Sequence, residues 1–141
     1  MCDSFYFSTA ADLWGELPYS QAVNSLYNEP EFDSQRSIHD AAITLIDQAI
    51  DNIEKGQDFS SLNDFTFSGN QEKWISCART LQARITLNWA EVNGAAAYSQ
   101  ALALAEQGIG DASGAGDGRP VHQEGSDGEE ASWHQIVEET L

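Results

Sequence analysis

The chain has 141 residues, of which 41% are hydrophobic and 10% aromatic, enough apolar material for one folded domain. Asp and Glu number 23 against six Lys and Arg, so the formal charge is −17. A field of this sign repels phosphate backbones and anionic lipid headgroups, which excludes nucleic acid as a partner, and it suits adaptation to molar salt, which screens self-repulsion over roughly 3 Å.

The first expected helix covers residues 3–14 and ends at Gly15, three residues before Pro18. Within such an apolar pattern, Trp14 is more often a core residue than a binding residue. Residues 19–33 are polar and contain Asn24, Asn28 and Pro30, so we expect a surface loop with one short turn at 21–26. The apolar positions of the first expected helix are Phe5, Phe7, Ala10, Ala11, Leu13 and Trp14.

The second expected helix has the clearest pattern, because Ser34 can cap its start and Gly56 follows its end. His39 is expected on the surface of this helix. Residues 58–70 then read as a loop that packs its apolar side chains inward, namely Phe59, Leu62, Phe65 and Phe67. The apolar residues of the second helix recur at intervals of three and four, at Ile38, Ala42, Leu45, Ile46, Ala49 and Ile53.

A third helix is expected over 71–93 and a fourth from about 95 to Gly108 and Ile109, which suit a C-terminal cap. The third carries an apolar stripe wide enough to need neighbours on two sides. Ala101 and Ala105 in the fourth resemble the small residues of a tetratricopeptide repeat. The stripe of the third helix comprises Trp74, Ala78, Leu81, Ile85, Trp89 and Val92, flanked by Ile75, Cys77 and Leu87.

These elements predict an all-α fold of about four helices, arranged as two tetratricopeptide-like hairpins within a domain spanning residues 1–109. The third helix should contact both neighbours. Residues 110–141 have no apolar periodicity and are rich in Gly, Asp and Ser, so we expect a disordered acidic tail, with residues 131–141 compatible with a short terminal helix.

The sequence offers no catalytic or metal-binding motif. His122 and His134 lie in the tail without the close spacing of a zinc-binding helix, and a calcium loop started at Asp111 lacks Glu at its twelfth position. Asp47 and Asp51 are expected on a solvated face. With no nucleophile elbow, P-loop or dinucleotide motif either, we expect a protein that is not an enzyme.

The two cysteines, Cys2 and Cys77, do not form a disulfide framework in the sequence. Cys77 reads as a small core residue. No basic and apolar stretch precedes Cys2, so we do not expect it to carry a lipid, and any export signal would lie upstream. The chain also lacks a run of roughly 18 apolar residues, so no segment is expected to span a membrane.

Exposed aromatic side chains are candidates for stacking on sugar rings. Tyr19 and Tyr27 are the best of these, because they fall in the expected loop. Trp133 is a further candidate, as is Trp14 if it is exposed.

Three stretches, in this order, resemble the SusD/RagB family of outer-membrane nutrient-binding lipoproteins. In the first of them a helix ends at a turn from Trp14 to Tyr19. The resemblance covers about Phe5 to Ile109. The stretches are FSTAADLWGELPYSQAV (7–23), PEFDSQRSIHDAAITLIDQAIDNI (30–53) and DFTFSGNQEKWISCARTLQARITLNWA (64–90).

The resemblance implies a helical fold, a lipid-anchored location at the outer-membrane surface, no cofactor and no catalysis. It also implies a TonB-dependent transporter that imports the captured glycan or peptide. Family members are several times longer, so this chain would be a fragment that supplies scaffold, with Arg84 pairing with an acid. The alternatives are a tetratricopeptide-like protein-interaction module, favoured by an apolar groove on the second and fourth helices, or a truncated remnant without function.

Overall fold

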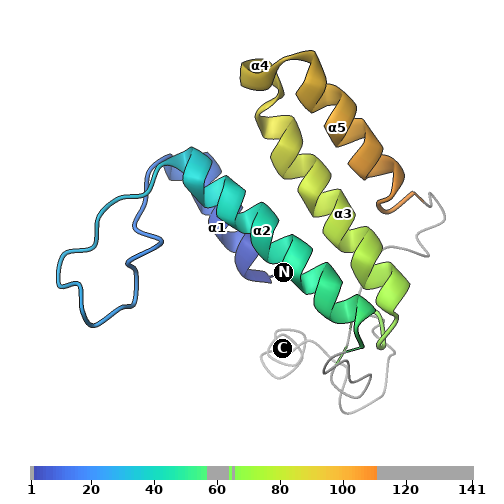
Figure 1. Ribbon diagram of the computed structural model, residues 1–141, viewed down its shortest axis with the longest axis horizontal. Helices are drawn as coiled ribbons and strands as arrows, with labels where there is room; N and C mark the ends of the chain where they lie inside the picture. Colours follow the sequence, from blue (N-terminus) through green and yellow to red (C-terminus); the bar gives the residue numbers. More distant parts are fainter. Residues whose placement is uncertain (1, 57–63, 65, 111–141) are drawn as a thin grey trace, which may run out of the picture.

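The computed structural model describes residues 2–56, 64 and 66–110 (Figure 1). Within these ranges the chain is helical, without strands beyond one isolated bridge, which confirms the predicted all-α, tetratricopeptide-like fold. The expected tail and its terminal helix lie outside the described residues, as do His122, His134, Trp133, Phe59, Leu62 and Phe65. The helices are α1 (Cys2–Trp14), α2 (Gln35–Glu54), α3 (Gln71–Asn88), α4 (Ala90–Asn93) and α5 (Ala95–Glu106).

The helix ends follow local backbone chemistry. Gly15 has a φ of +78°, a left-handed conformation that suits glycine, and its amide donates to the Ala11 carbonyl to close α1. Ser34 caps α2 by accepting a hydrogen bond from the Ser37 amide at 3.2 Å. Asn70 caps α3 in the same way, at 3.0 Å from the Lys73 amide. The predicted boundaries of the first two helices are therefore confirmed.

The third predicted helix, 71–93, is divided in the structure. The backbone leaves the α-helical conformation at Trp89, whose indole is held by a hydrogen bond to His39 of α2, and α4 adds only a single turn. Gly94, at a φ of +71°, then reverses the chain into α5. Val92 was expected on the apolar stripe and Leu87 beside it, but both are exposed. Val92 lies past the break at Trp89, where the stripe ends.

The described helices form two hairpins, one of α1 and α2 and the other of α3 and α5 (Figure 1). As predicted, α3 contacts neighbours on two sides, α2 and α5. The core lies between α2 and α3, where Ala42, Ile46 and Ile50 pack against Ala78 and Ile85. On its inward face α1 carries the small buried residues Ser4, Ser8 and Ala11, which let it approach α2 closely.

Asp64 organises the turn that precedes α3. Its carboxylate accepts the Trp74 indole N–H at 2.7 Å and the backbone amides of Thr66, Phe67 and Gly69 at 2.8 to 3.1 Å. Phe67, the one described member of the predicted inward aromatic set, is buried and packs edge-on against Trp74. Partial desolvation raises the pKa of Asp64, but these four hydrogen bonds outweigh it and lower the pKa from 3.8 to about 2.

The Asp64 carboxylate should make the fold acid-sensitive. Because its pKa is lower in the folded chain than in the unfolded chain, its contribution to stability is complete above about pH 4 and is lost as the pH falls towards 2. Chemical denaturation of Asp64→Asn and of the unsubstituted chain should therefore give free energies of unfolding that converge over this window. A difference that stayed constant from pH 7 to pH 2 would contradict this role.

Candidate functional site

The segment 15–33, called here the aromatic loop, projects away from the helices (Figure 1). Its two ends are held together by an antiparallel bridge, in which Leu17 and Asp33 exchange two backbone hydrogen bonds of 3.2 and 3.0 Å. A loop whose ends are this close is a compact surface projection and resembles other loops that carry binding residues.

The Asp33 side chain fixes the neck of the aromatic loop. It accepts hydrogen bonds from the Ser20 amide at 2.7 Å, the Tyr19 amide at 3.0 Å and the Ser20 hydroxyl at 3.0 Å. The Ser20 amide is the main reason that the pKa of Asp33 lies below its ordinary value. The carboxylate is therefore ionised at neutral pH and holds the chain reversal in place.

The two predicted sugar-stacking residues differ in their surroundings. Tyr19 is half-buried and packs edge-on against Phe7, with ring centroids 4.8 Å apart. Tyr27 is 46% exposed. Other large hydrophobic side chains of the aromatic loop and of the end of α1 are exposed too, namely Leu13, Trp14, Val23, Leu26 and Phe32.

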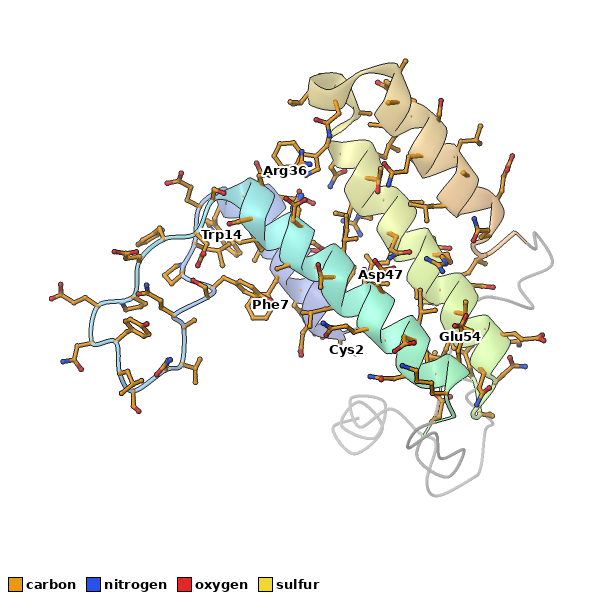
Figure 2. The ribbon with its side chains drawn as sticks, viewed as in Figure 1. Cys2, Phe7, Trp14, Arg36, Asp47 and Glu54 are labelled. Atoms are coloured by element: carbon orange, nitrogen blue, oxygen red, sulfur yellow. The ribbon has the colours of Figure 1, made fainter. Side chains whose placement is uncertain are left out.

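Trp14 is 74% exposed, so the expectation that it belongs to the core was wrong (Figure 2). The buried face of α1 consists of Ser4, Ser8 and Ala11, which are four and three residues apart. The next position on this face would be residue 15, so Trp14 lies outside it. The apolar spacing of α1 was therefore a poor guide, since its buried face is made of small residues and its large aromatic residues point elsewhere.

A second feature, called here the polar hollow, lies where the last turn of α1 and the first turn of α2 meet the end of α3. Asp12 comes from α1, and Asn88 and Trp89 come from the end of α3. The hollow is lined by Asp12, Gln35, His39, Asn88, Trp89 and Val92.

His39 is the centre of the polar hollow and is only 1% exposed, so its predicted place on the helix surface was wrong. Its Nε2 lies 3.1 Å from an Asp12 carboxylate oxygen and 3.2 Å from the Ser8 carbonyl. Its Nδ1 accepts the Trp89 indole N–H at 2.7 Å. Because an indole can only donate, the imidazole proton resides on Nε2. This one side chain thus ties α1, α2 and the end of α3 together.

The remaining contacts define what the hollow offers a ligand. Asn88 donates to the second oxygen of Asp12 at 2.9 Å, and the Arg36 guanidinium lies 5.0 Å from the centre of the Trp89 ring (Figure 2). Trp89 therefore links the end of α3 to α2, and the Arg36 guanidinium already covers one face of its ring. Amide and carboxylate groups of this kind bind hydroxyl groups. Across the described ranges no cluster of three or more His, Cys, Asp or Glu could hold a metal ion.

Three other predicted residues can be placed. Asp47 and Asp51 are exposed, as expected, and they pair with Arg79 and Lys55. Arg84 was expected to pair with an acid, but its guanidinium instead lies 5.6 Å from the centre of the Phe5 ring. The Lys and Arg side chains that form ion pairs within the described part of the chain are Arg36, Lys55 and Arg79.

Comparison with known proteins decides the identity of the chain. A SusD-like family model, described as "starch-binding associating with outer membrane", matches residues 2–136. The chain belongs to the SusD-like family. The predicted resemblance to SusD/RagB proteins is thereby confirmed. No curated protein matches this chain.

Solved SusD-like structures show the same helical arrangement. A SusD/RagB family protein from Bacteroides thetaiotaomicron is 28% identical, with a TM-score of 0.66 over 78% of this chain and 23% of that one. A SusD homolog from Bacteroides uniformis is 25% identical, with a TM-score of 0.55 over 71% and 20%. A second protein from B. thetaiotaomicron, 22% identical with a TM-score of 0.62 over 75% and 23%, supports the fold alone. The chain spans about a quarter of the length of these SusD-like proteins.

The hydrogen bond between Trp89 and His39 can be tested with matched substitutions. Trp89→Phe keeps an aromatic ring but leaves the buried Nδ1 of His39 without its donor, which should lower the free energy of unfolding by about 1–3 kcal/mol. Trp14→Phe makes the same chemical change at an exposed position and should alter it by less than about 0.5 kcal/mol. Equal effects in urea denaturation would show that the His39 network does not hold the helices together.

Proposed function

We propose that this SusD-like chain is part of a cell-surface protein that captures an oligosaccharide or similar nutrient and passes it to a TonB-dependent outer-membrane transporter. The protein binds its ligand without converting it. The observation that carries this proposal is the family match over residues 2–136, with its starch-binding and outer-membrane description.

The aromatic loop supports a binding role. Tyr27 and Phe32 of this loop, with Trp14 at the end of α1 beside its start, present large ring surfaces to solvent, and aromatic faces pack against the apolar faces of sugar rings. The neck fixed by Asp33 reduces the conformational entropy that ordering the loop would cost on binding. These rings are therefore the side chains of this chain that we expect to contact the ligand.

The charge of this part of the chain favours a neutral ligand. Arg36 is the first basic residue in the sequence, so the aromatic loop carries four acids, Glu16, Glu29, Glu31 and Asp33, without a Lys or Arg among them. An anionic sugar would meet electrostatic repulsion here. Asp12 and Asn88 in the polar hollow supply polar groups suited to the hydroxyls of a neutral sugar.

Attachment at the outer-membrane surface forms part of the proposal and rests on the same family match. Among the described residues, none of the helices combines the length and the apolar character that crossing a membrane requires.

Protein binding is the second candidate function. The apolar groove expected on the second and fourth predicted helices is not found there, because the hollow between α2 and α5 is lined partly by Asp47, Arg79 and Gln82. An apolar pocket instead lies between α1 and α3, where Phe5 and Leu81 are among its lining residues. A partner that docks there would make this segment an interaction module.

The capture function predicts that the exposed rings contribute to glycan affinity. In the full-length protein, Trp14→Ala combined with Tyr27→Ala should weaken binding of a neutral starch oligosaccharide about tenfold, which corresponds to about 1.4 kcal/mol, as measured by calorimetry. Tyr98→Ala on α5 removes an aromatic ring that is similarly exposed and should leave the affinity unchanged.

Two outcomes would contradict parts of this account. If no neutral glycan binds the unsubstituted protein, the capture function fails for this ligand class. If glycan binds but the Trp14 and Tyr27 substitutions have no more effect than Tyr98→Ala, the function stands and these exposed rings are not its site.

A further inference from the structure

The two free cysteines of the chain, 75 positions apart in the sequence, line the same pocket between α1 and α3. Cys2 is exposed at the start of α1, where Figure 2 labels it, and Cys77 is half-buried in α3. Their separation in the sequence gave no reason to pair them. The fold brings them to one place.

Two contacts show that α1 and α3 run in the same direction. Near the far end of α1, Asn88 donates to Asp12 at 2.9 Å, and nearer its start Arg84 lies over Phe5. Counting back from Asp12, Cys2 lies ten residues earlier, and Cys77 lies eleven residues before Asn88. At a rise of 1.5 Å per residue these are paths of about 15 and about 16.5 Å, so the two cysteines lie at similar heights along the two helices when counted from this contact.

The two cysteines also lie on facing sides of their helices. Cys2 shares its side of α1 with Phe5 and Tyr6, three and four residues later, and all three line the pocket. On α3, Cys77 shares its side with Leu81 and Arg84, four and seven residues later, and these line the pocket too. Both thiols are therefore directed into the space between the helices.

We propose that Cys2 and Cys77 form a disulfide that joins α1 to α3 across this pocket. The oxidant is a low-molecular-weight disulfide. The Cys2 thiolate attacks one of its sulfurs and expels one thiolate, and the Cys77 thiolate then attacks the Cys2 sulfur of the mixed disulfide and expels the second. The two cysteines lose two electrons in total, and the oxidant is reduced to two thiols that take up the two cysteine protons.

The surroundings of the pair give this bond specific properties. Association with the outer membrane places SusD-like proteins outside the reducing cytosol, where disulfides persist. Burial, together with the neighbouring Cys2, raises the pKa of Cys77. Because the thiolate is the attacking species, ring closure should accelerate as the pH rises above neutrality. The bond would draw the start of α1 towards α3 and narrow the pocket that separates them.

The test is oxidation of the reduced chain with oxidised glutathione, followed by alkylation under denaturing conditions and intact mass measurement. The proposal predicts a monomer that has lost two hydrogen atoms and takes up no alkylating agent, formed faster at pH 8.5 than at pH 7. The oxidised monomer should melt roughly 10 °C above the reduced one, because the bond closes a long loop in the unfolded chain. A monomer with both thiols still alkylated, or only intermolecular dimers, would overturn it.

A matched control tests the geometry and not merely the presence of two thiols. Cys2→Ser combined with Asp3→Cys keeps two cysteines but moves one thiol about 100° around α1, away from α3. This variant should stop at the mixed glutathione disulfide and show no rise in Tm. Closure of the ring at the same rate as in the unsubstituted chain would also overturn the proposal.

Discussion

Burial of one face of α2 between α1 and α3 is the interaction on which the rest of the molecule depends. Ile38, Ala42, Ile46 and Ile50 follow one another at intervals of four along this face, and Ile53 extends it. Burying a side chain of this size contributes roughly 1.5–3 kcal/mol. The face also carries His39, whose contacts with Asp12 and Trp89 fix how far α1 and α3 can turn about α2. That arrangement determines where the aromatic loop and the polar hollow lie, and it brings Cys2 of α1 and Cys77 of α3 to the same pocket.

Apolar burial has to outweigh the repulsion of a formal charge of −17. The ion pairs in the described part of the chain offset little of it, because pairs such as Arg36–Asp40 and Lys55–Asp51 are exposed, and exposed pairs contribute at most about 1 kcal/mol. Salt would screen the remaining repulsion, which is why adaptation to high salt stays our prediction for this sequence.

The sequence predicted the helices well where local chemistry decides them. Ser34, Asn70 and the glycines at 15, 56 and 94 mark helix ends through caps and left-handed conformations that depend on few other residues. The break at Trp89 could not be predicted this way, because it accompanies a hydrogen bond to a residue fifty positions away. His39 did leave a signal, since it lies three and seven residues before the buried Ala42 and Ile46, but a polar residue at such a position reads equally well as the border of the face.

The candidate site was predicted less well than the fold. Tyr27 proved exposed, as a loop residue should be, whereas Trp14 was assigned to the core because an aromatic residue in an apolar pattern is usually buried. That rule fails for α1, where close packing against α2 leaves room only for Ser and Ala. The cysteine pair depends on how two helices align in space, which no local pattern encodes.

The most direct test of this account is the free energy of unfolding of Ile46→Ala compared with that of Leu102→Ala. Ile46 is 0% exposed at the centre of the buried face of α2, whereas Leu102 is 61% exposed on α5. If the α2 face holds the helices in one core, Ile46→Ala should lower the free energy of unfolding by about 2–5 kcal/mol in a single cooperative transition, and Leu102→Ala should change it by less than about 0.5 kcal/mol. Similar small effects at both positions, or two separate transitions, would contradict it.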